Sequence, residues 1–167
     1  MTVNIDLACG FSPKSKWIGL DIRKECKPHV VCDFSDGIPL KDSCVDEVNC
    51  SNFIEHLKPE DCKKFVKEII RVCKIGSIVV VAVPSYDLDK TYVPEHLSFH
   101  SDCWLSYSRF SNEYFNVEKV IYPPSDLWES GEVQKLIPGI THELARKLFR
   151  NMTKNIVFKL IVKKKIE

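Results

Sequence analysis

VNIDLACGFSPKSKWIGLDIR, residues 3–23, contains two strand-like apolar runs joined by a short loop. Asp6 lies within the first run, Asp21 ends the second, and Gly10 follows the first run almost directly. A glycine at such a turn lets the backbone bend sharply and approach a ligand without a side chain in the way. The loop leaves almost no room for the helix that nucleotide-binding α/β folds place after their first strand. This stretch therefore predicts an α/β sheet with an unusually short first connection.

Further strand-like runs follow at residues 29–33, 45–50 and 77–83. Because these runs are almost continuously apolar, they predict a sheet that is covered on both faces. Between the last two, residues 59–76 predict the clearest helix in the chain. Pro59 and the acidic residues after it suit a helix start, Gly76 suits a carboxyl-terminal cap, and the apolar residues recur at helical spacing.

The second half of the chain predicts a helix at 101–110, a strand at 115–123 and a proline-rich loop through 139. A helix near 141–150 and a final strand at 155–163 follow. The sequence shows no repeat, low-complexity tract or interdomain linker. We therefore expect residues 1–167 to form a single α/β domain.

Composition narrows the function classes. The chain has 44% hydrophobic and 28% charged residues and a formal net charge of +1, which gives no broad electrostatic reason to bind nucleic acid or an anionic membrane. No window approaches the roughly 20 apolar residues that cross a bilayer, and the amino terminus lacks the pattern of a secretion signal. Its eight cysteines include no C-x-x-C pair and predict reduced thiols. We expect a cytoplasmic protein without a membrane segment.

Polar and aromatic residues follow the predicted strands at positions suited to a nucleoside. In open α/β sheets the ligand lies beyond the carboxyl ends of the strands, where a carboxylate such as Asp21 accepts hydrogen bonds from ribose hydroxyls. Asp33 is placed to accept a hydrogen bond from an adenine amino group, and the Phe34 ring can pack on a base. Ser51 and Asn52 leave the sheet at the same edge, so the sequence predicts one crevice for all of them.

The segments IDLACG, GLDI, VVCDF, DEVNCSNFIEHL and IIRVCKIGSIVVVAVP together resemble the successive motifs of class I S-adenosylmethionine-dependent methyltransferases. More narrowly, the chain is similar to small type 11 methyltransferases in which a tryptophan and a second-strand aspartate soon follow the first motif. The resemblance implies a Rossmann-like, three-layer α/β/α fold with a mostly parallel seven-stranded sheet and an antiparallel last strand. It also implies that S-adenosylmethionine is the cofactor and that the short first connection, FSPKSKW, is a feature of this compact type.

The resemblance further implies the cofactor-binding residues. Some would line the methionine end, others the ribose, the adenine and the sulfonium: Asp6, Ala8, Cys9, Gly10, Asp21, Ile22, Asp33, Phe34, Ser51 and Asn52. The chain departs from the family pattern at Ala8, where the usual first motif has glycine. That change and the missing helix imply weak cofactor binding, or an open site completed by substrate or partner.

The methyl acceptor is expected to be a small molecule, enclosed by the long segment 84–100. His96, His100 and His56 are candidate bases for an acceptor hydroxyl or amine. Packing within the loop is an equal alternative for the first two, and a structural role is favoured for the third. His96, His100 and Cys103 also have spacings that could ligate zinc, with Glu95 or Asp102 as a fourth ligand. Because the set lacks a paired C-x-x-C, we expect no metal.

Two other function classes stay open. A non-catalytic or partner-dependent binding protein could keep the fold and the cofactor, because fold alone does not fix function. An NAD-dependent oxidoreductase would share the second-strand carboxylate but should show G-x-G-x-x-G opening a full helix. Here the next glycine after Gly10 is Gly19, inside the second strand. The sequence favours the methyltransferase and leaves its acceptor and oligomeric state open.

Overall fold

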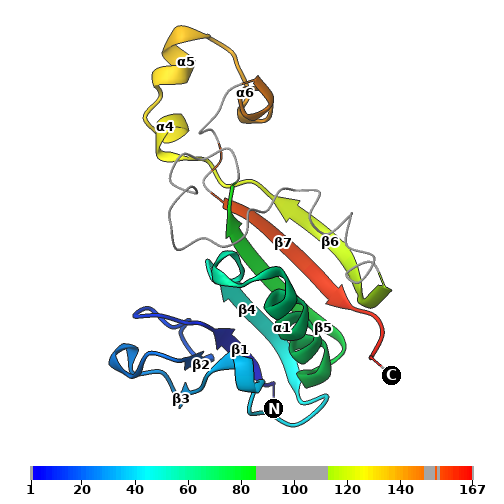
Figure 1. The fold of residues 1–167 in the computed structure, drawn as a ribbon. Helices are drawn as coiled ribbons and strands as arrows, with labels where there is room; N and C mark the ends of the chain where they lie inside the picture. Colours follow the sequence, from blue (N-terminus) through cyan, green and yellow to red (C-terminus); the bar gives the residue numbers. More distant parts are fainter. Residues whose placement is uncertain (1, 86–112, 149–152, 154, 167) are drawn as a thin grey trace.

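The computed structural model describes residues 2–85, 113–148, 153 and 155–166 (Figure 1). Its strands are β1 (Asn4–Leu7), β2 (Ile18–Asp21), β3 (Val30–Val31), β4 (Val45–Ser51), β5 (Cys73–Pro84), β6 (Phe115–Ile121) and β7 (Asn155–Val162). Its helices are α1 (Pro59–Val72), α4 (Asp126–Glu129), α5 (Glu132–Leu136) and α6 (His142–Leu148), with 3-10 turns η1 (Lys24–Cys26), η2 (Phe34–Asp36) and η3 (Ile54–His56). None of these helices has the length and apolar character needed to span a bilayer.

The described strands form one seven-stranded sheet in the order β3-β2-β1-β4-β5-β7-β6. Strands β1 to β5 pair in parallel, whereas β7 is antiparallel to both β5 and β6. The predicted α/β class and the mostly parallel sheet with an antiparallel last strand are thereby confirmed. Because β1, β2 and β4 are parallel, their carboxyl ends meet at one edge of the sheet, and the chain order reverses between β1 and β4. Ligands bind at such switch points in open α/β sheets.

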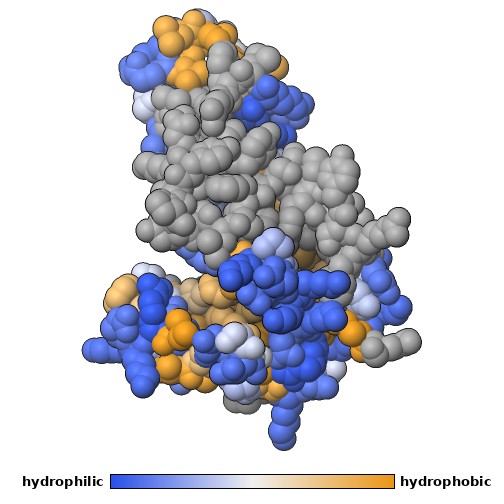
Figure 2. All heavy atoms as spheres, in the orientation of Figure 1, coloured by the Kyte–Doolittle hydropathy of each residue, from blue (hydrophilic) through white to orange (hydrophobic). Residues whose placement is uncertain are grey.

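Helix α1 covers one face of the sheet beside β4 and β5 (Figure 1). Pro59 occupies its first turn, where a missing N–H costs no helical hydrogen bond, and Glu60 and Asp61 complement the helix dipole. The helix buries Phe65 and Ile69 at helical spacing, together with other apolar residues, against the strands. Hydrophilic residues cover its solvent side (Figure 2). The predicted helix is confirmed, and it anchors the main core.

Residues 8–17, all of them described, form turns rather than a helix, as the sequence predicts. The backbone N–H of Lys14 donates to Oδ2 of Asp6 at 2.8 Å, and the N–H of Cys9 donates to the carbonyl of Leu20 at 3.2 Å. A methyl group at Gly19 would lie 2.8 Å from the Cys9 sulfur and 3.2 Å from Cβ of Pro13. The loop therefore packs directly on β2, and the absence of a side chain at Gly19 makes that packing possible.

Several predicted boundaries are wrong. Helix α1 ends at Val72, and Gly76, with φ +87°, lies inside β5, where the register with β4 shifts, instead of capping the helix. Glycine commonly allows such a bulge. The expected strand 29–33 shortens to β3, because Asp33 caps the turn η2.

The expected proline-rich loop before residue 139 also contains two short helices, α4 and α5. Ser125 caps the first of them by accepting from the N–H of Trp128 at 3.3 Å. The strand and helix expected after the loop are confirmed as β7 and α6. The helix predicted at 101–110 lies outside the described residues.

Candidate functional site

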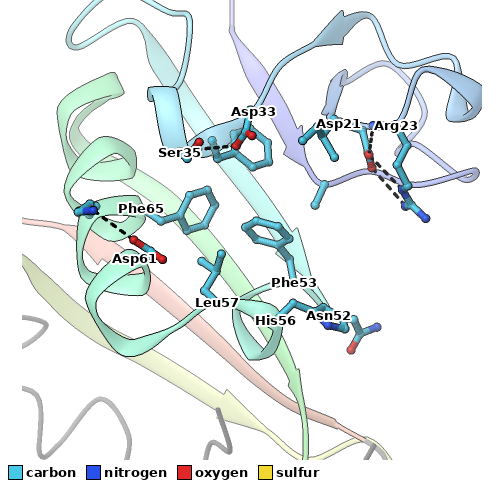
Figure 3. A pocket seen from close by; sticks show the side chains of 14 residues that line it. Asp21, Arg23, Asp33, Ser35, Asn52, Phe53, His56, Leu57, Asp61 and Phe65 are labelled. Carbon is cyan, nitrogen blue, oxygen red and sulfur yellow. Dashed lines mark hydrogen bonds and ion pairs between the residues drawn. The ribbon is translucent and has the colours of Figure 1, made fainter. Parts of the chain in front are cut away.

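A pocket of about 510 Å3 opens at the carboxyl edge of the sheet, next to the switch point between β1 and β4 (Figure 3). Its lining comes from the ends of β1, β2 and β4, from η2 and η3, and from the start of α1: Ala8, Asp21, Ile22, Arg23, Asp33, Phe34, Ser35, Asn52, Phe53, His56, Leu57, Asp61, Lys64 and Phe65. The volume falls within the range of about 300–1,000 Å3 that is typical of cofactor and ligand sites. The lining brings together segments that are far apart in the sequence.

One wall of the pocket is aromatic. The rings of Phe34, Phe53 and Phe65 lie with their centroids 5.1–5.4 Å apart in edge and tilted arrangements. They come from η2, from the second residue after the end of β4 and from α1, and Leu57 extends the same surface. Mutual contact holds the three rings in place, and the wall offers an apolar surface to a planar base.

The opposite wall carries a buried carboxylate. Asp21, 2% exposed, ends β2 and accepts hydrogen bonds from the backbone N–H of Gly10 at 2.8 Å and of Arg23 at 2.9 Å. The Arg23 side chain adds an ion pair at 3.2 Å. Burial raises the pKa of Asp21, but the hydrogen bonds from Arg23 and Gly10 outweigh it and hold the pKa below its ordinary value. The group is therefore a fixed anion at neutral pH.

Two strand ends at the pocket turn through left-handed backbone. Ala8, after β1, and Asn52, after β4, both have φ of 52°. The N–H of Asn52 donates to the carbonyl of Ala82 at 2.8 Å, and its Oδ1 accepts from Nδ2 of Asn155 at 3.3 Å. Asparagine tolerates this conformation, whereas alanine adopts it at a cost. The two turns direct the chain away from the sheet on either side of the switch point.

The pocket gathers many of the residues predicted to bind the cofactor, namely Ala8, Asp21, Ile22, Asp33, Phe34 and Asn52. Asp6, Cys9, Gly10 and Ser51 lie nearby but do not line it. Asp6 is 4% exposed, and its carboxylate accepts from the Lys14 N–H and from Nδ2 of Asn49 at 2.7 Å. Its observed contacts hold the first loop to β1 and β4.

Among the other predicted site residues, some lie at the pocket and some lie outside the described residues. Oδ1 of Asp33 accepts from the N–H of Ser35 at 2.8 Å, so this carboxylate caps η2 as well as lining the pocket. His56 ends η3 and lines the pocket beside Asn52 (Figure 3). His96 and His100 lie outside the described residues, as does Cys103. The described part of the chain contains no cluster of three or more potential metal ligands.

Sequence reasoning missed part of the lining. Phe65 is one of the apolar residues whose helical spacing predicts a buried face for residues 59–76; it is buried in α1, and it also lines the pocket. Phe53 directly follows Asn52 and carried no periodic signal. Arg23 stands two residues after Asp21, a spacing that could have indicated a local ion pair.

Comparisons with known proteins find similarity to methyltransferases. Residues 5–81, which contain the pocket, match the model of a family described as a methyltransferase domain. A SAM dependent methyltransferase from Archaeoglobus fulgidus superposes with a TM-score of 0.68 at 23% identity, covering 95% of this chain and 86% of that one. No curated protein sequence matches the chain.

Other solved structures are similar over nearly the whole chain. One is a complex between the Haloferax volcanii Trm112 methyltransferase activator and the putative methyltransferase, with a TM-score of 0.67, 16% identity, and coverage of 99% of this chain and 84% of that one. Another is geranyl diphosphate C-methyltransferase from Streptomyces coelicolor A3(2), in complex with Mg2+, geranyl diphosphate and S-adenosyl-L-homocysteine. It has a TM-score of 0.61, 13% identity, and coverage of 97% and 73%. At these identities the structures establish a shared fold.

Proposed function

We propose that the protein binds S-adenosylmethionine and methylates a small-molecule acceptor, because residues 5–81 match a methyltransferase-domain model and the chain has the fold of class I S-adenosylmethionine-dependent methyltransferases. The observation that carries the proposal is the pocket at the switch point, with the Asp21 carboxylate on one wall and the aromatic wall opposite. The transfer would be an O- or N-methylation. Solved neighbours with the same fold include a Haemonchus contortus phosphoethanolamine N-methyltransferase in complex with S-adenosyl-L-methionine.

The lining residues fit this cofactor. Asp21 offers an anion to the ribose hydroxyls, Phe34 and its aromatic neighbours offer an apolar surface to adenine, and Asn52 offers a polar group beside them. When bound, S-adenosylmethionine supplies a methyl group that its sulfonium charge already activates. The protein then has to hold the acceptor in line with that group, about 3 Å away, and keep water out.

A base for the acceptor is a separate proposal. His56 lines the pocket and is the candidate within the described residues, and His96 and His100 stay candidates from the sequence. Once an acceptor is known, loss of turnover in His56→Ala with unchanged cofactor affinity would support His56 as the base. Full turnover in that variant would instead favour a structural role.

The first experiment is calorimetric titration of the purified protein with S-adenosylmethionine, S-adenosylhomocysteine and NAD in parallel. Saturable binding of the first two, and none of NAD, supports the proposal. Asp21→Ala should lower the affinity for S-adenosylhomocysteine by at least about 30-fold, since hydrogen bonds to a charged group contribute about 1.5–3 kcal/mol each. Equal affinity in this variant would contradict the ribose assignment.

Asp46→Ala is the matched control. Asp46 stands at the amino end of β4, at the opposite edge of the sheet, where it also accepts from a backbone N–H (Val3, 2.8 Å) and pairs with a cation (Lys74, 2.7 Å). Its removal should affect folding in a similar way to the loss of Asp21. It should leave S-adenosylhomocysteine affinity unchanged, because Asp46 does not line the pocket.

A partner-dependent or non-catalytic binding protein is the second candidate. Phe11, Ile22 and Val31 are 72%, 56% and 47% exposed around the first loop and the β2–β3 connection. Exposed apolar side chains near an open site are typical of a surface that another molecule covers. One similar structure contains a methyltransferase together with its activator. Absence of binding for all three ligands would favour this candidate.

A further inference from the structure

The side chain of Arg23 is hydrogen-bonded to the carboxylate of Asp21, the group that the proposed function assigns to the ribose hydroxyls. Nε of Arg23 donates to Oδ1 of Asp21 at 3.2 Å, and Nη2 donates to Oδ2 at 3.4 Å. The backbone N–H groups of Gly10 and Arg23 donate to the same two oxygens. A carboxylate has about four acceptor sites. The carboxylate of Asp21 is therefore saturated by donors from the protein itself.

These four donors are not equivalent. The two backbone bonds, at 2.8 and 2.9 Å, are fixed by the turns after β1 and β2. The two bonds from the guanidinium are longer, and the Arg23 side chain is 50% exposed, so its ion pair is worth little and is screened by salt. A vicinal diol brings two O–H donors. It can replace the two guanidinium bonds one for one while both backbone bonds stay in place.

The guanidinium also lies beside the glycine that follows β1. A methyl group built at Gly10 would lie 3.4 Å from Nη2 of Arg23. The guanidinium carbon is 5.8 Å from the centroid of the exposed Phe11 ring, within the range of a cation–π contact. Phe11 therefore offers the charged group a second contact when it leaves Asp21.

We propose that Arg23 is a built-in competitor for the ribose subsite, whose guanidinium pairs with Asp21 in the free protein and gives up that carboxylate when the vicinal diol of a nucleoside cofactor binds. The inference rests on the proposed function, because it takes the cofactor to be an adenosine derivative. It makes Arg23 a residue that sets cofactor affinity by acting on Asp21. Binding then exchanges one pair of hydrogen bonds for another, so the release of Arg23 offsets part of the affinity that the ribose hydroxyls contribute.

The experiment measures S-adenosylhomocysteine affinity by calorimetry in the wild type, Arg23→Met and Arg23→Lys. Methionine keeps an unbranched apolar stem and removes every donor. Arg23→Met should therefore bind S-adenosylhomocysteine about three- to fivefold more tightly, which is the effect expected from losing a half-exposed ion pair. Arg23→Lys keeps the charge without the two-pronged donor and should lie between. Arg146→Met is the matched control. It removes an equal charge from a guanidinium 3.8 Å above the Tyr122 ring and should leave affinity unchanged.

Salt dependence separates competition from a merely structural role. Between 50 and about 500 mM NaCl, screening weakens the Arg23–Asp21 pair, so wild-type affinity should rise while Arg23→Met stays flat. Unchanged or weaker binding by Arg23→Met, with a wild type that binds, would overturn the inference and leave the proposed function standing. Binding of S-adenosylhomocysteine by Arg23→Met but not by the wild type would support the inference. Absence of binding in both proteins would overturn the proposed function and the inference with it.

Discussion

At the scale of single residues, the turns at the pocket show where this chain departs from the methyltransferase pattern that it resembles. The resemblance implied glycine at the position of Ala8, and the structure shows why, since φ there is 52°. This left-handed conformation costs an L-amino acid with a Cβ about 1–2 kcal/mol. Asn52 adopts the same φ at a lower cost, because a short polar side chain tolerates it. The strained backbone at Ala8 therefore lies at the edge of the proposed cofactor site.

Ala8→Gly should raise the free energy of unfolding by about 0.5–1 kcal/mol, because relief of the left-handed strain exceeds the entropy that glycine loses on folding. Urea unfolding followed by circular dichroism measures the change. Ala145→Gly, at a fully buried position in α6, is the control and should destabilise by about 1 kcal/mol. A destabilising Ala8→Gly would contradict the strain at this turn.

At the scale of elements, the Arg71 side chain helps to hold α1 to the segment before β4. Arg71 donates to the carbonyls of Ile38 and Leu40, each at 2.8 Å, and pairs with Glu68 at 2.8 Å and Asp42 at 2.6 Å. Hydrogen bonds to Glu68 and Asp42 raise the pKa of Arg71, so the guanidinium is permanently charged. The planar five-donor group joins a helix to a loop about thirty positions earlier.

Arg71→Met should lower the free energy of unfolding by about 2 kcal/mol, since it leaves carbonyls and the Glu68 carboxylate without their charged donor. Thermal and urea unfolding measure the loss. Lys64→Met is the control, because the ion pair of Lys64 with Asp61 is exposed and should contribute at most a few tenths of a kcal/mol. Equal stability of both variants would show that the Arg71 contacts do not hold α1 in place.

At the scale of the whole molecule, carboxylates that pair with cations or backbone N–H groups set the response of the fold to pH. Hydrogen bonds from Arg71 lower the pKa of Glu68, and a hydrogen bond from Lys74 lowers that of Asp46. At Asp21 burial acts in the opposite direction, but its hydrogen bonds prevail and lower the pKa. A carboxylate with a lowered folded-state pKa stabilises the fold above its unfolded-state pKa, and that contribution is lost as the pH falls through the folded-state value.

The urea midpoint should therefore stay nearly constant from pH 7 to 5 and fall steadily below the ordinary values of 4.5 for glutamate and 3.8 for aspartate. Glu68→Gln should make that fall shallower, because one of the titrating groups is gone. The measurement is a series of urea unfolding curves between pH 7 and 3. A midpoint that does not decline at acid pH would contradict these pairings.

Much of the architecture followed from local signals. Apolar runs located the strands of the sheet, helical spacing and Pro59 located α1, and the short first connection was read directly from the loop length. The ends of these elements were less accurate, because Gly76 serves a bulge in β5 and Asp33 a cap of η2. The pairing of β5 with β4 decided the role of Gly76, whereas a local hydrogen bond to the Ser35 N–H decided that of Asp33. Helices α4 and α5 were missed because each is only about one turn long.

The sequence by itself determined the fold class and the order along the chain of the strands that end at the site, because these depend on hydrophobic periodicity. It also predicts a binding role for Asp21 from the residue type at a strand end. Only the tertiary structure decided which side chains share the pocket. It brought Phe34, Phe53 and Phe65 together from three elements and placed the Arg23 guanidinium on Asp21. The physical reason is that hydrogen bonds and ring contacts depend on the direction and separation of side chains in space, and packing of the whole sheet fixes both.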